Sequence, residues 1–289
     1  MKKYKLTFIC LILFSFSLST FAKTVFTYHS EDTDRDNRKQ YEIEILNLSL
    51  QKTIDKYGDF ELVASPRMNL KRAALSLEQN SINNFILKVS ASSELLENFA
   101  YANFPVDRGI VGYRVSFISP EMKNKIENIK SLSELKKLKI GQGIGWLDTD
   151  ILKYNGFNVK VVNNYDSLFN MLSFNRIDLF PRGINEIQGE LESFSNIKNL
   201  DYDRTFLLYY PLPRFFFAHK SNQKLLDRIE EGLKLAYLDG SLDKVFDKYY
   251  KPSVDLLNLK DRKFYKIKNP YLENIDSSYE KYIFNPFKK

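Results

Sequence analysis

The sequence predicts an α/β protein made of two similar units, and two observations lead to this prediction. In the stretch Lys139–Glu186, short apolar runs alternate with segments of helical period such as Leu168, Met171 and Leu172. Such alternation is typical of a parallel sheet with helices on its faces. A similar order of runs occurs earlier in the chain, before a join near Gly109–Ser119.

The first unit contains three predicted strands and two predicted helices. The predicted strands are Thr24–Tyr28, Phe60–Ser65 and Asn84–Val89, and the helices lie near Arg38–Tyr57 and Leu70–Leu77. Asp32, Asp34 and Asp36 precede the first helix, but they lack the central glycine and terminal glutamate of an EF-hand loop. We therefore expect them to favour the start of the helix rather than to bind calcium.

The second unit has three short apolar runs that we expect to be strands, at Leu138–Ile140, Val159–Val162 and Ile177–Phe180. Thr205–His219 follows as an extended run, interrupted by Pro211 and Pro213, which cannot donate to a central ladder. Helical stripes then appear at Asn222–Ala236 and from Leu242 to Tyr249. Residues 251–289 give no clear pattern and are expected to wrap the surface or to be partly disordered.

The N-terminus predicts a secretory signal peptide over residues 1–22. Lys2, Lys3 and Lys5 precede the apolar run Leu6–Leu18, and Ala22 ends a small-residue cleavage motif. A retained membrane anchor is the alternative, although the run is short for a bilayer span. Cleavage would place the protein in the periplasm without a cysteine, since Cys10 is the only one, and hence without a lipid anchor.

Charge and residue usage exclude several classes of function. The formal net charge of +7 falls to +4 once the three lysines of the signal peptide are removed, and basic and acidic residues are mixed along the helices, so nucleic acid is a poor partner. His29 and His219 are the only histidines, so the chain has too few histidines and cysteines for serine triads, Cys–His pairs or zinc sites to be expected. Carboxylate pairs for glycoside hydrolysis stay possible, but we expect no enzyme, no metal and no cofactor.

Three segments resemble the type II periplasmic solute-binding proteins, in the family that includes the polar amino acid receptors of ABC importers. They are Ser131–Trp146, the turn and strand at Asn175–Asp178, and the closing helices at Leu225–Tyr250. The resemblance implies a two-lobed α/β fold, with a ligand cleft between the lobes and two crossing strands near Tyr113–Phe117 and Tyr209–Pro213. It divides the chain into lobe 1 (23–112 and 213–250), lobe 2 (113–212) and a tail (251–289).

The resemblance also implies three contacts to an α-amino acid, and this sequence lacks all three. Where such receptors place an arginine for the carboxylate, this chain has Leu96. Trp146 stands in place of a threonine, and Gly183 in place of the aspartate that holds the ammonium. We therefore expect a solute that is anionic or otherwise different from the common amino acids.

Candidate ligand contacts lie at predicted strand ends, where open parallel sheets bind ligands. Arg182 follows the run Ile177–Phe180 and could grip an anion, or could pair with Glu186 or Glu190 instead. As a pure ligand contact, it should be replaceable by alanine without loss of stability. Trp146 could stack on a flat ligand or could only pack the lobe. The remaining candidates come from both units: Tyr28, His29 (more plainly a turn histidine), Arg67, Ser90, Gly145 and Asn185.

The predicted function is capture of a small solute by closure of the two lobes, most simply for an ABC importer. The alternative is a sensory or interaction protein that reports ligand occupancy to a separate membrane receptor. Either way the partners are a small molecule and a membrane permease or receptor, and we expect a monomer. Permease genes beside this one would favour transport.

Overall fold

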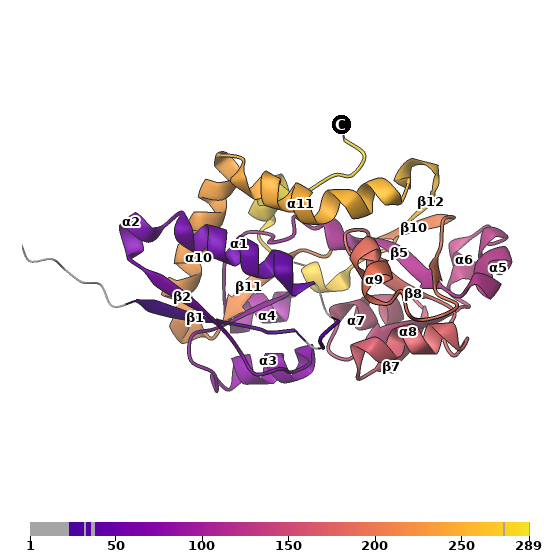
Figure 1. The fold of residues 1–289 in the computed structure, drawn as a ribbon, viewed down its shortest axis with the longest axis horizontal. Helices are drawn as coiled ribbons and strands as arrows, with labels where there is room; N and C mark the ends of the chain where they lie inside the picture. Colours follow the sequence, from indigo (N-terminus) through magenta and orange to yellow (C-terminus); the bar gives the residue numbers. More distant parts are fainter. Residues whose placement is uncertain (1–22, 32, 36–37, 274, 289) are drawn as a thin grey trace, which may run out of the picture.

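The computed structural model describes residues 23–288 apart from 32, 36, 37 and 274. The predicted signal peptide and two of the three aspartates before the first helix thus lie outside the described residues. Two α/β lobes lie side by side along the long axis of the molecule (Figure 1). No helix in the described part of the chain is both long and apolar enough to cross a membrane.

Lobe 1 is built on a five-stranded sheet with the order β2-β1-β3-β11-β4. Its strands are β1 (Thr24–Tyr28), β2 (Phe60–Ala64), β3 (Phe85–Ser90), β4 (Ala100–Tyr101) and β11 (Arg214–Ala218). Its helices are α1 (Lys39–Gln51), α2 (Ile54–Tyr57), α3 (Leu70–Glu78), α4 (Ser93–Asn98), α10 (Gln223–Leu238) and α11 (Ser241–Leu256). The strands β1, β2 and β3 are parallel, whereas β11 is antiparallel to β3.

Lobe 2 is built on the sheet β12-β10-β5-β8, to which β9 adds by pairing with β5. Its strands are β5 (Tyr113–Ile118), β6 (Lys139–Gly143), β7 (Asn158–Val162), β8 (Phe180–Gly183), β9 (Asp201–Tyr202), β10 (Phe206–Tyr209) and β12 (Lys263–Lys266). Its helices are α5 (Lys123–Glu127), α6 (Leu132–Leu135), α7 (Leu147–Tyr154), α8 (Tyr165–Ser173) and α9 (Ile187–Ser193). The pair β6-β7 is joined to the main sheet by a parallel bridge between Ile140 and Leu179.

The apolar runs become strands because they bury their side chains in each lobe. Phe26 in β1 and Leu87 in β3 are fully buried in lobe 1. In lobe 2, Phe169 stacks on Phe194 with ring centroids 3.7 Å apart. Helix starts are fixed locally, as where Asn164 accepts a hydrogen bond from the backbone N–H of Ser167 at the start of α8.

The strand predicted at Ile177–Phe180 lies three residues later in the structure. Strand β8 runs from Phe180 to Gly183 and is antiparallel to β5, with Val115 opposite Arg182. Pro181 is tolerated because β8 is at the end of its hydrogen-bonded sheet path. Arg182 therefore lies within a strand and does not follow one.

The chain passes between the lobes at two adjacent segments, one before β5 and the other between β10 and β11. The backbone N–H of Tyr210 donates to the carbonyl of Gly112 at 3.1 Å, so the two crossings touch. A Cβ atom at Gly112 would lie 2.5 Å from the carbonyl oxygen of Tyr210, which explains the glycine. The two crossings are thus packed closely against each other.

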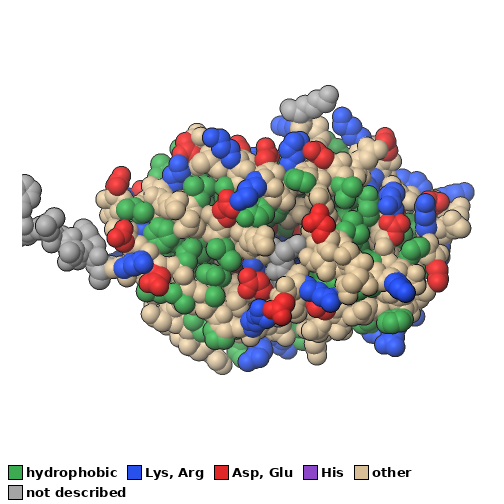
Figure 2. Space-filling model, in the orientation of Figure 1, with side chains coloured by type: hydrophobic (Ala, Val, Ile, Leu, Met, Phe, Trp, Pro, Cys, Tyr) green, Lys and Arg blue, Asp and Glu red, His purple; other side chains and the backbone are tan. Residues whose placement is uncertain are grey.

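The tail joins both lobes. Strand β12 is parallel to β10 in lobe 2, and Asn269 then donates to the carbonyl of Pro211 at the crossing. Further on, the ring of Tyr279 lies 5.4 Å from that of Phe215 in the lobe 1 core. For the described part of the tail, the expectation that it wraps the surface is thus closer to the structure than the alternative of partial disorder. Figure 2 shows that charged side chains of both signs are mixed over both lobes on this face of the molecule.

Candidate functional site

A small cavity of about 70 Å³ lies between the lobes. Its charged lining among the described residues comprises Arg38, Lys39, Lys88, Arg182 and Arg214, together with two carboxylates, Glu42 and Asp148. Its uncharged lining is His29, Leu70, Val89, Ser90, Trp146 and Leu147. Cations outnumber carboxylates in this lining, although Arg182 also pairs with Glu186 and Glu190, which lie outside it.

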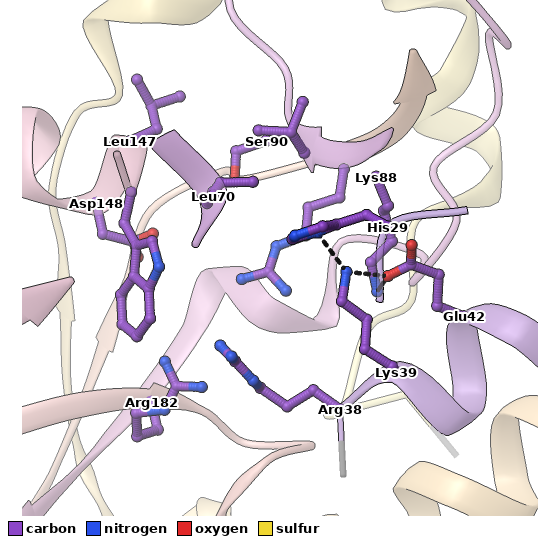
Figure 3. A pocket seen from close by; sticks show the side chains of 13 residues that line it. His29, Arg38, Lys39, Glu42, Leu70, Lys88, Ser90, Leu147, Asp148 and Arg182 are labelled. Carbon is purple, nitrogen blue, oxygen red and sulfur yellow. Dashed lines mark hydrogen bonds and ion pairs between the residues drawn. The ribbon is translucent and has the colours of Figure 1, made fainter. Parts of the chain in front are cut away.

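The lobe 1 wall is organised around Glu42 on α1, which lies between two lysines. Lys39 Nζ is 3.1 Å from Glu42 Oε2, and Lys88 Nζ is 3.4 Å from the same oxygen (Figure 3). Burial alone would raise the pKa of Glu42, but the two lysines outweigh it and hold that pKa below its ordinary value. Burial lowers the pKa of Lys88, because the pairing with Glu42 offsets only part of its desolvation.

His29 supports Lys39 from the end of β1. Lys39 Nζ lies 3.0 Å from His29 Nδ1, and His29 Nε2 lies 2.8 Å from the carbonyl oxygen of Met68. Since a carbonyl only accepts, Nε2 carries the hydrogen and Nδ1 accepts from the lysine. The histidine is therefore a neutral residue that fixes the position of Lys39.

The lobe 2 wall has the opposite arrangement, with Arg182 between two glutamates. Arg182 Nε is 2.8 Å and 2.9 Å from the two oxygens of Glu190, and Nη2 is 2.6 Å from Glu190 Oε1 and 3.0 Å from Glu186 Oε1. Burial would lower the pKa of Arg182, but both glutamates outweigh it and raise that pKa. Nη1 has no hydrogen-bond partner among the described residues.

The two glutamates differ from each other in the direction in which their pKa values shift. Burial would raise the pKa of Glu186, but Arg182, Arg214 and Arg114 outweigh it and lower that pKa to about 2. Glu190 accepts hydrogen bonds from Arg182 and, at 2.6 Å, from the Tyr165 hydroxyl. Burial nevertheless dominates and raises the pKa of Glu190. Glu186 is thus the firmly ionised member of the pair.

Further ion pairs lie at the crossings. Asp148 pairs with the buried Arg114 and accepts a hydrogen bond from the Tyr210 hydroxyl at 2.6 Å. Arg214 lies 3.9 Å from Asp107 and 3.8 Å from Glu186, so it connects the two lobes. Both carboxylates that line the cavity, Glu42 and Asp148, therefore already have cationic partners.

Neither a protein-family model nor a curated protein sequence matches this chain. Solved structures do match. An ancestral arginine-binding protein aligns with a TM-score of 0.59 at 18% identity, covering 79% of this chain and 99% of its own. The fold is that of a type II periplasmic binding protein.

Two bacterial proteins of this fold align in the same way. A Salmonella typhimurium periplasmic binding protein with high arginine specificity has a TM-score of 0.59 at 14% identity, covering 79% of this chain and 100% of its own. An amino acid ABC transporter substrate-binding protein from Streptococcus pneumoniae, bound to L-arginine, has a TM-score of 0.56 at 15% identity, covering 79% and 94%. At such low identity the alignments establish the fold alone.

Within this periplasmic binding protein fold, four of the residues predicted from the sequence meet at the cavity: His29, Ser90, Trp146 and Arg182. The Arg182 guanidinium carbon lies 4.9 Å from the Trp146 ring centroid, so each of them contacts the other as well as the cavity. The pairing of Arg182 with Glu186 and Glu190, considered from the sequence as an alternative to ligand binding, is present.

The other four predicted residues lie outside the cavity. Asn185 lines a neighbouring pocket between α1, α9 and α11, and Gly145 lines a groove on the other side. Arg67 is largely exposed and pairs with Asp34 at 2.5 Å. Tyr28 ends β1, and no described cavity is lined by it.

Sequence reasoning missed Lys39, Glu42 and Lys88, which dominate the lobe 1 wall. A signal was present for Lys88, because it is a charged residue within the apolar strand Phe85–Ser90, and its side chain is only 8% exposed. Arg114, in the fully buried strand β5, carries the same signal. A lysine or arginine inside a buried strand needs a partner and so marks a polar site.

Metal binding finds no support among the described residues, where no group of three histidine, cysteine, aspartate or glutamate side chains could hold an ion. The carboxylates of the site pair with cations instead. The arrangement is thus suited to holding a charged solute by hydrogen bonds and ion pairs.

Proposed function

We propose that this protein is a periplasmic solute-binding protein that captures a small solute carrying an anionic group between its two lobes and delivers it to a membrane importer. The observation that supports the proposal is the cavity at the lobe boundary, lined by five cations and two carboxylates. The fold, shared with substrate-binding proteins of ABC transporters, agrees with it.

The anionic group would be held mainly by lobe 1. Glu42 can offset only one of the two lysines beside it, so Lys39 and Lys88 together carry an excess positive charge. Arg182 would add Nη1 from lobe 2, as its other donors are engaged by Glu186 and Glu190. Charge-assisted hydrogen bonds of this kind contribute about 1.5–3 kcal/mol each.

A free α-amino acid fits the site less well, because both carboxylates that line the cavity already have cationic partners. Gly183 has no side chain, and a Cβ atom there would lie 2.4 Å from Asn185 Oδ1. Asp148 is already paired with Arg114 and Tyr210. A cation in this cavity would have to compete with an arginine for that carboxylate.

Capture would involve closure of the lobes about the two crossings. A ligand shifts the equilibrium towards the closed state only by its differential affinity for that state. Small-angle scattering should then show a contraction when the ligand is added. An unchanged profile at saturation would instead indicate a rigid cleft and count against transport.

The solute class is tested by thermal shift on protein unfolded and refolded to remove bound solute. We expect stabilisation by members of a panel of carboxylates, phosphates and sulfates, with about 2.7 kcal/mol at a concentration of 100 times Kd. Arginine, glutamine and lysine should give none. Stabilisation by those amino acids alone would contradict an anionic solute, and stabilisation by nothing in a broad metabolite panel would contradict solute capture.

A further inference from the structure

The cavity is large enough for an anionic group but not for a whole solute of ordinary size. Its 70 Å³ measures the positions open to the centre of a water molecule, and a single water needs about 10–15 Å³ by that measure. The space therefore admits a few water-sized groups, such as a carboxylate or a phosphate. The rest of the solute must leave the cavity in some direction.

A groove of about 980 Å³ opens from one wall of the cavity. Five residues line both spaces: Leu70, Val89, Ser90, Trp146 and Leu147. Figure 3 places Leu70, Ser90 and Leu147 on one side of the cavity and Arg38 and Arg182 on the opposite side. A solute with its charge near the arginines would thus point its body past the two leucines into the groove.

The groove is lined by charged as well as apolar side chains, and both lobes contribute apolar ones. Leu75 on α3 is 49% exposed and Val161 on β7 is 41% exposed, and both line the groove. Leu95 in α4 and Phe99, the residue that follows α4, add further apolar surface. Exposed apolar residues that face one groove from two lobes would be covered by a ligand with an apolar part.

We propose that the solute is an anion with an apolar body, the charged head lying in the cavity and the body lying along this groove. The inference rests on the proposed function and specifies its solute class. The cations of the cavity hold the head, and burial of Leu75 and Val161 against the body makes affinity rise with chain length.

The experiment is calorimetric titration of refolded protein with acetate, hexanoate, octanoate and decanoate. Affinity should rise roughly 3- to 4-fold for each methylene that enters the groove. Leu75→Gln should weaken decanoate binding about 5- to 10-fold and leave acetate unchanged, because only the longer chain reaches position 75. Leu238→Gln is the matched control, since Leu238 is an exposed helical leucine outside the groove, and it should change neither.

Several outcomes would overturn the inference. Equal affinity for acetate and decanoate would show that the groove is not used, and the proposed capture of an anion would stand. Equal binding of decylammonium and decanoate would show apolar binding without selection by the cations. If none of the four carboxylates binds while another anion stabilises the protein, the inference of an apolar body is wrong but the proposed function stands. If no anion binds at all, both the inference and the proposed function are wrong.

Discussion

The two walls of the cavity carry the same kind of ion triad with opposite charge. In lobe 1 one carboxylate, Glu42, lies between two lysines, whereas in lobe 2 one guanidinium, Arg182, lies between two glutamates. The lobe 1 triad has an excess of positive charge, but the lobe 2 triad does not. Arg182, which stands out in the sequence as an anion contact, is therefore better neutralised by its neighbours than the two lysines of lobe 1 are.

The comparison predicts that loss of the central arginine has the largest effect on stability. Arg182→Ala leaves Glu186 and Glu190 buried without their main partner, and breaking a buried pair in this way costs about 3–5 kcal/mol. Urea unfolding measures this loss. The buried pairs of Arg182 thus argue against the expectation that alanine at position 182 leaves the fold nearly as stable, and this measurement decides between the two.

Arg204→Ala is the matched control for that experiment. Arg204 lies in the same lobe and pairs with Asp201 at 2.9 Å, but its side chain is about half exposed. Exposed pairs contribute about 0–1 kcal/mol. Similar losses in the two variants would show that the Arg182 triad is not the buried anchor of lobe 2.

An intermediate effect is expected from pH, through Glu186. The pKa of Glu186 is lowered to about 2 from an ordinary value of 4.5, so its stabilisation is present above about pH 4.5 and is lost as the pH falls towards 2. The melting temperature of the wild type should fall over this range. Glu186→Gln should flatten that fall, because glutamine does not titrate, and parallel pH profiles would contradict the assignment.

The smallest effect on stability is expected in lobe 1. Lys88→Met removes one lysine but leaves Glu42 paired with Lys39, so no buried charge is left without a partner. We expect the free energy of unfolding to change by less than about 1.5 kcal/mol. A loss as large as that of Arg182→Ala would show that the two lobes depend equally on their triads.

The order of elements could be predicted from the sequence because it depends on local patterns. The strands Thr24–Tyr28 and Phe60–Ala64 and the helix at Leu70–Glu78 all lie where apolar runs and periods place them. Strand β8 could not be placed correctly, since Pro181 and Gly183 disfavour strands and only the pairing with β5 imposes one.

The site was only partly predictable because its pairs join distant parts of the chain. Lys88 on β3 meets Glu42 on α1, and no sequence pattern specifies that these two positions face each other. Arg182, Trp146 and His29 were found because they lie near strand ends, where ligands bind in open α/β sheets. Lys39 had no comparable signal, since a lysine at the start of a helix is usually solvent-exposed.

Calorimetric titration of Lys88→Met tests the central claim, that the excess positive charge of lobe 1 holds an anionic solute. The titrant is the anion that stabilises the wild type most, and the control is Lys56→Met, which removes a lobe 1 lysine that pairs with Glu231 at an exposed position. We predict that Lys88→Met loses affinity about 10- to 100-fold and that Lys56→Met loses none. Unchanged affinity in a stably folded Lys88→Met variant would contradict this account.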